Sequence, residues 1–575
     1  MPTTRPRSFR SIEDGESVLK TALCRKQWTI AFVFYLAASL VYFLPSLGMF
    51  GDHLIGPPED NMFILWSLWY GASSWWHAGA GFLHTHQIFY PEGISLFFCN
   101  YYFWGVFLAF FLKLLFAMPL VYNLLVVHTF VLAGLGACFL IHELTGDFKA
   151  ALVGGFVFAF NPSHWAHSLH HLTIASIQFI PFFAAFTIRA ARKGKKSDMA
   201  WAAFFMTLDA LSDWNYLVYD LLFLGLGLLY LIFRNPRKTA LHLKRLAPIP
   251  LAACVCLSPL IVPMVWVGWH HPFVETLPGH DTYVADFLGF FVPDPYHFLG
   301  RTVDAFKNWN AAMTGNDWEK TVYLGWSNLC LFAAGGFAVW KKTAKYFAGF
   351  LAFLVLAMGS HPHFLGRALP FPFPYRLIQA LPFLTQARNP SRIIVYAYLF
   401  LAILVAFSVR ALLVRLKTAH LAKMAAAVMV FLIFLDFAPP GLAMTPVALP
   451  AGYDAIVRDP DKNFGLLELP WDGARYMMYQ TMHGIPCVQG YMGRRIEKTL
   501  VDRLIYDVHR LPEQKKMLIE SHVKYIVLYK TKIAEEPGNR AAEMRRFLMT
   551  KFAQIYARAY EKIYEDEDMA VFKVY

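Results

Sequence analysis

Three carboxylates lie close together in the stretch GDHLIGPPEDNMFILWSLWYG, residues 51–71, which directly follows a long apolar run. They are Asp52, Glu59 and Asp60. An acidic residue at the start of a helix satisfies free backbone N–H groups, so Glu59 and Asp60 could cap a helix over Met62–Tyr70. A carboxylate can also accept a proton in catalysis or bind a divalent metal, either Mg²⁺ or Mn²⁺. The stretch therefore predicts a cap, a site, or both.

Histidines gather in a second stretch, NPSHWAHSLHH, residues 161–171. Helical spacing predicts that His164, His167 and His171 share one face. A zinc site is one interpretation, but no cysteine or fixed histidine pairing accompanies them, and histidines at a membrane surface explain the pattern equally. Binding of substrate by His164 and His167 is a further hypothesis.

Other polar residues emerge between apolar runs. The turn SDWNY contains Asp213 and Trp214, and Asp286 lies in a later connecting segment; all three are candidate substrate contacts. Arg388 and Arg392 stand in QARNPSR, directly before an apolar run. They either anchor a helix end at the head groups or bind phosphate, for which the planar guanidinium is suited. The sequence contains no P-loop, GxSxG or HExxH signature of a soluble enzyme.

The composition indicates a membrane protein with many spanning segments. The 575 residues are 57% hydrophobic, 17% aromatic and only 16% charged, whereas soluble domains carry about 25% charged residues. The net charge of +13 comes from short basic blocks between apolar runs, such as Arg189–Lys196 and Arg234–Arg245. This is the positive-inside pattern of cytoplasmic loops, so we expect no nucleic-acid partner. The seven cysteines show no metal-binding or disulfide spacing.

The apolar runs predict an all-α bundle with about 11–13 transmembrane helices over residues 28–440. Residues 1–27 are expected to be a cytoplasmic tail, and the loop 50–100 to lie on the outer side with the carboxylates. Twelve candidate segments occur, but a cytoplasmic N-terminus and an external C-terminus require an odd number of crossings. We expect 101–118, which is short and carries Lys113, not to cross. The candidates are 28–49, 101–118, 121–142, 149–161, 172–191, 198–212, 216–233, 247–269, 322–340, 346–359, 393–413 and 424–440.

Residues 441–575 have a different character. Strand patterns occur at 464–469, 525–529 and 570–575, and helical patterns with mixed charge at 494–520 and 539–559. We predict a small extracytoplasmic α/β domain, which either binds an acceptor or serves as a structural lid.

Several stretches resemble the integral-membrane glycosyltransferases of the GT-C fold, which use a polyprenyl-phosphate sugar. They are GDHLIGPPEDNMFILWSLWYGASSW with IFYPEGISL, VYNLLVVHTFVLAGLGACFLIHELTG, FAFNPSHWAHSLHHLTIASIQFIPFF, LDALSDWNYLVY, EKTVYLGWSNL, LPFLTQARNPSRI and LLELPWDGARYMMYQTMHGIPCVQGYMGRR. The individual motifs are loose, and their order along most of the chain is the stronger signal.

The resemblance implies transfer of a sugar, hexose or pentose, from a polyprenyl phosphate or diphosphate to a glycan, lipid or protein acceptor, with inversion. It assigns the catalytic base to Asp60, with Asp52 and Glu59 as helpers or alternates, and lipid-phosphate binding to Arg388 and Arg392. Desolvation near the membrane can raise the basicity of such a carboxylate. The implied location is the bacterial or archaeal cytoplasmic membrane, where the chain contacts membrane lipids and its active site faces outward.

Two other functions compete with this one. A transporter or flippase would need charged residues along a path through the bundle, for which Lys113, Asp209 and Asp220 are the candidates. An assembly protein would use its outer domain to bind a partner.

Overall fold

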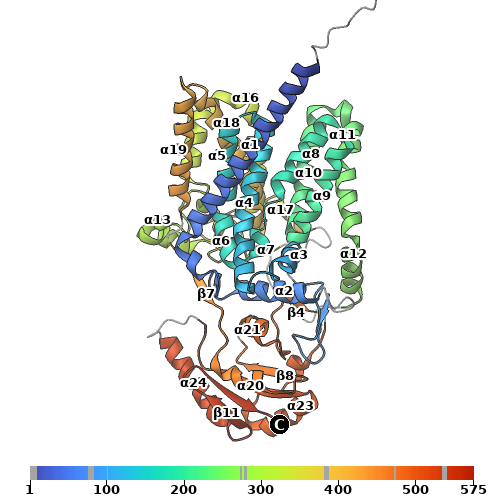
Figure 1. The fold of residues 1–575 in the computed structure, drawn as a ribbon, viewed down its shortest axis with the longest axis vertical. Coiled ribbons are helices and arrows are strands. Elements are labelled where there is room, and N and C mark those ends of the chain that lie inside the picture. Colours follow the sequence, from blue (N-terminus) through green and yellow to red (C-terminus); the bar gives the residue numbers. More distant parts are fainter. Residues whose placement is uncertain are drawn as a thin grey trace, which may run out of the picture.

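Apolar helices lie side by side through most of the chain, and a domain built on a four-stranded sheet follows them (Figure 1). The computed structural model describes residues 10–74, 83–99, 101–271, 275–276, 282–380, 388–438, 441–471, 474–495, 497–533 and 540–575. Among these residues, six segments are long and apolar enough to cross a membrane: Arg25–Met49, Met118–Thr145, Trp214–Arg234, Pro236–His270, Pro390–Leu413 and Ala419–Phe437. The chain is a polytopic, mainly helical membrane protein.

Shorter helices complete the bundle beside these six. Chain reversals use local signals: Gly146 and Gly194 end helices in the left-handed conformation, and the Asp147 side chain accepts from the Ala150 N–H at 2.9 Å. The bundle helices are α1 (Arg10–Phe43), α4 (Met118–Thr145), α5 (Phe148–Ala159), α8 (Ile180–Lys193), α9 (Lys196–Ser212), α10 (Trp214–Arg234), α12 (Pro248–His270), α15 (Trp326–Gly335), α16 (Trp340–Ala357), α18 (Ile394–Leu413) and α19 (Ala419–Phe437).

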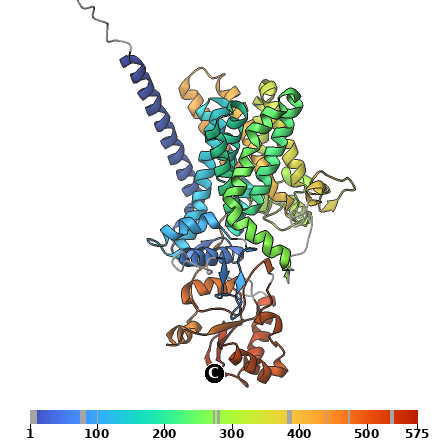
Figure 2. The same ribbon diagram turned by 90° about the vertical axis from the view of Figure 1, so that its right-hand side faces the viewer.

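Helix α18 lies at the centre of the bundle. Its apolar window is 89% buried, against 17% for α19, although both helices are long and apolar enough to cross a membrane. A helix that is apolar on all sides can be buried in protein or face lipid, and here packing against α5, α15 and α16 decides between the two. Successive helices alternate in direction, so the basic loops collect near α11 (Thr239–Leu246), at the end opposite the C-terminal domain (Figures 1 and 2).

The segment 101–118 forms only the short helix α3 (Phe103–Leu112), and α4 then begins at Met118. This agrees with the expectation that it does not cross. The neighbouring helix α2 (Asp60–Ser74) contains the helix predicted over Met62–Tyr70. Twelve of its fifteen residues are buried, because it packs between α3 and α21 (Arg475–His483) of the C-terminal domain. Helix α2 therefore forms an internal layer between the helix bundle and the C-terminal domain (Figure 1).

The C-terminal domain contains a sheet with strand order β11-β12-β10-β8. The central strand β10 (Val523–Tyr529) pairs in parallel with β8 (Gly465–Leu469) and antiparallel with β12 (Met569–Lys573), which also pairs with β11 (Glu561–Glu565). All three predicted strands are present. The predicted helix 539–559 is α24 (Arg540–Tyr556), whereas 494–520 is divided into β9 (Arg494–Arg495), α22 (Leu500–Arg503) and α23 (Leu511–Glu520).

Short elements connect these parts on the side of the C-terminal domain. Strand β1 (His53–Ile55) follows the first bundle helix. It pairs antiparallel with β7 (Met444–Pro446), which follows the last bundle helix. The remaining short elements are α6 (Pro162–His170), α7 (Leu172–Ala175), α13 (Phe298–Thr302), α14 (Asp304–Ala312), α17 (Tyr375–Gln379), α20 (Asp454–Arg458), β2 (His84–Thr85), β3 (Ile94–Ser95), β4 (Glu275–Thr276), β5 (His363–Phe364) and β6 (Arg367–Ala368).

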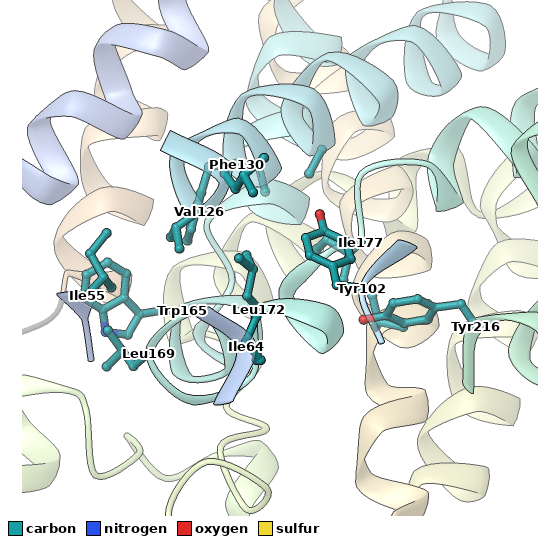
Figure 3. Close-up of a cluster of buried hydrophobic side chains, with 14 of the residues drawn as sticks. Ile55, Ile64, Tyr102, Val126, Phe130, Trp165, Leu169, Leu172, Ile177 and Tyr216 are labelled. Atoms are coloured by element: carbon teal, nitrogen blue, oxygen red, sulfur yellow. The ribbon is translucent and has the colours of Figure 1, made fainter. Parts of the chain in front are cut away.

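Buried apolar side chains from β1, α2, α4, α6 and α7 form one cluster at this end of the bundle (Figure 3). Ile55, Ile64, Val126, Trp165 and Leu172 are all at most 2% exposed. Burial of a large apolar side chain contributes about 1.5–3 kcal/mol to the stability of the fold. This cluster therefore holds in place the short polar segments that are attached to it.

The charged residues that could serve a transporter are not in one row among the described residues. Lys113 ends α3 and donates to the Ser73 hydroxyl at 2.9 Å, outside the long helices. Asp209 and Asp220 lie together between α9 and α10, where the Tyr396 hydroxyl donates to Asp220. This is a local cluster of buried polar groups and gives no support to a path across the bundle.

Candidate active site

The start of α2 presents Glu59 and Asp60 at a fixed position. The Asn61 side-chain oxygen accepts from the backbone N–H groups of Glu59 at 3.0 Å and Met62 at 2.9 Å. Asn123 of α4 fixes the preceding strand, accepting from the Ile55 N–H at 3.0 Å. The predicted capping role therefore belongs mainly to Asn61, which leaves the two carboxylates free for other partners.

Gly56 allows this segment to lie directly against α6. Its φ angle is +101°, and a Cβ atom there would be 1.8 Å from the Leu169 carbonyl oxygen. Only glycine fits such a backbone contact. The Gly56 carbonyl also accepts from the Thr445 hydroxyl at 2.8 Å, so the segment is held from both sides. This close approach brings Glu59 and Asp60 to the C-terminal end of α6.

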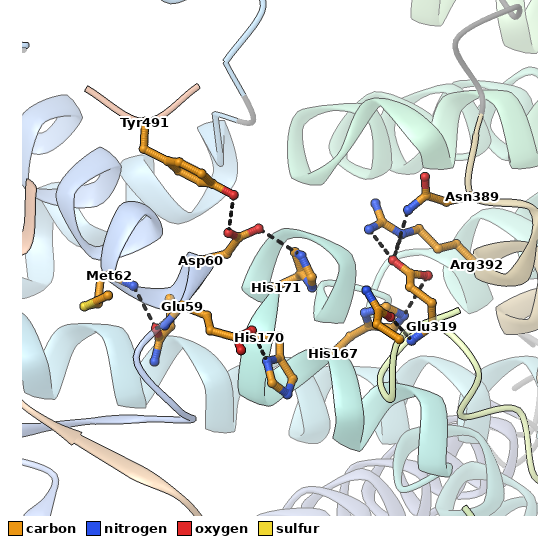
Figure 4. A network of polar contacts seen from close by, with 12 residues as sticks. Glu59, Asp60, Met62, His167, His170, His171, Glu319, Asn389, Arg392 and Tyr491 are labelled. Carbon is orange, nitrogen blue, oxygen red and sulfur yellow. Dashed lines mark hydrogen bonds and ion pairs between the residues drawn. The ribbon is translucent and has the colours of Figure 1, made fainter. Parts of the chain in front are cut away.

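Two carboxylate–histidine pairs form there (Figure 4). The Glu59 Oε2 atom lies 3.0 Å from His170 Nδ1, and the Asp60 Oδ2 atom lies 2.9 Å from His171 Nε2. The carboxylate side chains keep 43% and 31% of their exposure, whereas both histidines are buried. Each pair thus has one immobilised partner and one partner that solvent or a ligand can reach.

Side chains from distant segments complete the arrangement. The Tyr491 hydroxyl, from the C-terminal domain, donates to Asp60 Oδ1 at 2.8 Å. The other ring nitrogen of His170 is 2.8 Å from the Tyr296 hydroxyl, and the Trp318 ring stacks on His170 at 4.1 Å. Asp60 is therefore oriented by His171, which lies just beyond α6, and by Tyr491, which lies 431 residues later in the chain.

The pKa of Asp60 is lowered. Burial acts to raise it, but the hydrogen bond and charge of His171, the Tyr491 hydroxyl and the positive charge of Arg392 outweigh burial. The expectation from the sequence, that desolvation makes the carboxylate more basic, is therefore wrong for the free protein. Asp60 is instead ionised over the whole neutral range and available as a hydrogen-bond acceptor.

A second cluster surrounds Glu319, which is 1% exposed (Figure 4). Its Oε1 atom accepts from Arg392 Nε at 2.8 Å and Asn389 Nδ2 at 3.0 Å, and its Oε2 atom accepts from the Ser391 hydroxyl at 3.0 Å. Burial acts to raise the pKa of Glu319, but the Arg392 charge dominates and lowers it to about 2. Because its guanidinium is committed to this carboxylate, the geometry favours a structural role for Arg392 over the predicted phosphate contact.

Arg388 differs from Arg392. It is partly buried, and the described residues provide no hydrogen bond or ion pair to its guanidinium. Its pKa is lowered by burial and by the like charge of Arg392. The pKa of Arg494 of β9 is lowered by burial and by the charge of Arg388. Like charges held close together favour an anionic ligand between them, so the phosphate hypothesis is supported best at Arg388.

The other predicted site residues have local roles. Asp52 is 74% exposed and pairs with His53 at 2.7 Å, with no contact to Glu59 or Asp60 among the described residues. His164 is buried, bonds to Thr129 at 3.0 Å and stacks on Phe130. Asp213 and Asp286 accept from backbone N–H groups at the start of α10 and of a 3-10 turn, respectively.

The histidine row is divided among different partners. His164 faces α4, and His167 lies 4.0 Å from Glu319, while His171 reaches Asp60 from just beyond the end of α6. Trp214, the first residue of α10, is partly buried.

A metal site does not fit the groups present. Within the described part of the chain, no three His, Cys, Asp or Glu residues come together in a way that could hold a metal ion. Asp52 is remote, and Glu59 and Asp60 each face a separate histidine. A metal held by protein side chains alone needs three or more converging ligands, which these residues do not provide, so the steps below use only side chains of this chain.

Sequence reasoning missed His170, Tyr491 and Glu319. His170 adjoins His171 in the sequence, but it does not lie on the helical face that His164, His167 and His171 were predicted to share. It can pair with Glu59 because α6 ends at His170 and the chain turns there. Glu319 and Tyr491 reach the site from segments 150 or more residues away from α6, so no local pattern could indicate them.

Comparison with known proteins shows similarity of fold and little similarity of sequence. No family model matches the chain, and no curated protein matches it by sequence. The arabinofuranosyltransferase AftD from mycobacteria aligns with a TM-score of 0.54 at 12% identity, over 96% of this chain and 41% of AftD. This chain thus spans about two fifths of AftD.

Two further solved structures align more weakly. The archaeal oligosaccharyltransferase AglB from Archaeoglobus fulgidus, in complex with an inhibitory peptide and a dolichol-phosphate, gives a TM-score of 0.48 at 12% identity, over 87% of this chain and 69% of AglB. ArnT from Cupriavidus metallidurans bound to undecaprenyl phosphate gives 0.42 at 12% identity, over 95% and 98%.

Proposed function

We propose that this chain, which has the GT-C fold, is a membrane glycosyltransferase that moves a sugar from a polyprenyl phosphate or diphosphate to a cell-envelope acceptor. The observation that carries the proposal is the Asp60 carboxylate. This carboxylate is partly exposed at one end of an apolar bundle. It is held by His171 and Tyr491, and the positive charge of Arg392 acts on it. Its chain neighbour Glu59 is held in the same way by His170.

The reaction needs a proton acceptor next to the attacking hydroxyl. Asp60 accepts a hydrogen bond from the acceptor hydroxyl, whose oxygen attacks the anomeric carbon and forms the new glycosidic bond. The bond from the anomeric carbon to the phosphate oxygen breaks, and its electron pair leaves with the lipid phosphate. Because the pKa of Asp60 is lowered, the proton moves to the carboxylate late, when bond formation has made the hydroxyl acidic. Direct displacement inverts the anomeric centre.

Stabilisation of the leaving phosphate is the role of Arg388. A partly buried guanidinium to which the described residues provide no hydrogen bond can form two parallel hydrogen bonds to phosphate oxygens. The charge that develops on the phosphate is then met by a group already in place. Arg494 adds a second positive charge from the C-terminal domain.

The architecture suits a donor that is half lipid. The hydrocarbon of a polyprenyl carrier stays among the apolar helices, while its phosphosugar head meets a site built from short segments at one end of the bundle. The basic loops lie at the opposite end, which the positive-inside rule assigns to the cytoplasm. We therefore place the site on the outer face of a bacterial or archaeal cytoplasmic membrane.

The test is release of lipid phosphate from a donor panel. The purified protein in nanodiscs is incubated with polyprenyl-phosphate hexoses and pentoses, with added methyl glycosides as acceptors, and the freed lipid phosphate is measured by mass spectrometry. We expect release from at least one donor, and its loss in Asp60→Asn. Asp52→Asn is the matched control, because the Asp52 side chain is exposed in the same segment and pairs with His53. Equal activity of Asp60→Asn and the wild type would refute the mechanism.

A further inference from the structure

A cavity of about 790 Å³ lies in the C-terminal domain, next to the candidate active site. Its wall is formed by the C-terminal ends of β8 and β10, by α22 and α24, and by the segment Gln489–Gly493. Phe89 of the first outer segment completes it. The volume lies within the range of roughly 300–1,000 Å³ that is typical of small-molecule sites, and it is roomy enough for a disaccharide.

Flat aromatic rings dominate the lining. Their faces can stack on the C–H face of a sugar ring, and several of them are substantially exposed, including Trp471 at 58%, Tyr506 at 46% and Phe552 at 36%. Large apolar side chains left open to water mark a ligand site more often than a structural surface. The aromatic lining residues are Phe89, Trp471, Tyr491, Tyr506, Phe552 and Tyr556.

A polar group in the wall has no partner. Gln489 is only 1% exposed; its side-chain oxygen accepts from the Glu468 N–H at 3.2 Å, but its Nε2 atom has no hydrogen-bond partner among the described residues. A buried donor left without a partner costs about 1–3 kcal/mol. A ligand hydroxyl that accepts from Gln489 would remove that cost, which points to a ligand with polar groups.

A charged pair in the wall adds to this polar character. Arg495 donates to Asp502 at 2.5 Å, and the guanidinium lies over the Phe89 ring, 5.5 Å from its centroid. Arg495 also donates to the Glu497 carbonyl at 3.3 Å, so the pair forms a fixed polar part of the wall. Aromatic faces together with such groups match the alternating C–H and O–H surfaces of a saccharide.

Tyr491 connects the cavity to the reacting carboxylate. It lines the cavity, and its hydroxyl donates to Asp60. A ligand in the cavity is therefore one side chain away from the proposed proton acceptor. Donor lipid is expected among the bundle helices, so the cavity suits the other substrate.

We infer that this cavity binds the acceptor and that the acceptor is a saccharide. A lipid chain would leave the Gln489 amide unsatisfied, whereas a saccharide offers hydroxyl groups to that amide and C–H faces to the aromatic rings. This inference rests on the proposed function for the term acceptor, but binding itself needs no chemistry and can be tested separately.

The test is saturation-transfer NMR on the full-length protein in nanodiscs. The probes are the methyl glycosides of glucopyranose, mannopyranose, galactopyranose and arabinofuranose, with an uncharged tripeptide as the comparator. We expect ring protons of at least one glycoside to receive saturation. Gln489→Leu should weaken its affinity at least tenfold, as should Tyr506→Ala, whose half-exposed side chain can be removed without unfolding the domain.

Two controls separate this inference from the proposed function. Phe547→Ala changes an exposed residue of α24 outside the lining and should bind as the wild type does. Asp52→Asn, which changes an exposed carboxylate paired with His53 outside the lining, should also keep the wild-type affinity for the glycoside. Absence of glycoside binding, binding unaffected by both lining variants, or preferential binding of the tripeptide would overturn the inference. Failure of lipid-phosphate release with intact glycoside binding would overturn only the proposed reaction.

Discussion

The Asp60 and Glu319 carboxylates both face basic side chains around α6, but they differ in what else can reach them. Asp60 keeps 31% of its side-chain exposure and has two hydrogen-bond partners, whereas Glu319 is 1% exposed and surrounded by Arg392, Asn389 and Ser391. A carboxylate with remaining access can receive a substrate hydroxyl, and a fully enclosed one cannot. Access therefore favours a chemical role for the first cluster and a structural role for the second, which holds the chain before α18 in place.

The largest loss of activity is expected from a change at Asp60. Asp60→Asn should reduce transfer by about 10²–10⁴, the usual contribution of a positioned base, because the amide cannot accept the proton. The thermal unfolding midpoint should stay near that of the wild type, since the side chain is partly exposed. Initial rates of lipid-phosphate release and a melting curve in the same detergent measure both quantities. A large loss of stability would place Asp60 with Glu319 as a structural residue.

The opposite behaviour is expected at Arg392. Arg392→Met leaves Glu319 buried without its cation, which should destabilise the protein by about 3–5 kcal/mol in denaturant unfolding. The control is the double variant Arg392→Met with Glu319→Leu, which removes both charges and should recover most of the stability. If Arg392→Met keeps full stability and loses donor binding, Arg392 is a phosphate ligand after all.

Arg388 should affect the donor and leave folding intact. Arg388→Gln removes a charged hydrogen bond of about 1.5–3 kcal/mol, so kcat/KM for the donor should fall roughly 10- to 100-fold. Arg367→Gln, at an exposed position on the same end of the bundle, is the matched control. Steady-state kinetics with varied donor concentration decide the matter, and equal losses in the two variants would indicate only a general effect of surface charge.

The two clusters should also differ in their response to acid. The folded-state pKa of Glu319 is lowered to about 2, below its ordinary value of 4.5. Its stabilising effect is therefore complete above pH 4.5 and is lost as the pH falls from 4.5 towards 2. The free energy of unfolding of the wild type should drop over this window. The double variant lacking both charges should drop less, and parallel curves would contradict the assignment.

The smallest effect is expected from chelation. Because Glu59 and Asp60 each face a separate histidine, EDTA should leave lipid-phosphate release unchanged. Release measured with EDTA and then with added Mg²⁺ or Mn²⁺ checks this. Loss on chelation and recovery with either metal would show that the substrates complete a site that the protein side chains alone do not form.

The sequence predicted the parts of this molecule that depend on local patterns. Apolar runs placed the bundle helices, and alternation placed β8, β10 and β12. The three carboxylates stand out because they follow an apolar run, and the resemblance to GT-C enzymes singles out Asp60 among them. By contrast, Tyr491 and Glu319 meet the site through tertiary packing, and no spacing rule relates residue 60 to residue 491. The pKa of Asp60 was misjudged for the same reason, since burial was foreseeable but His171, Tyr491 and Arg392 as neighbours were not.

The pairing of β1 with β7 has a consequence for biosynthesis. His53–Ile55 emerge from the ribosome early, but their partner strand Met444–Pro446 follows only after the last bundle helix. Until that strand arrives, the edge of β1 and the glycine turn next to it lack one of their two supports. The nascent protein therefore acquires an ordered site only at the end of translation, and a chain released before residue 446 would enter the membrane without one.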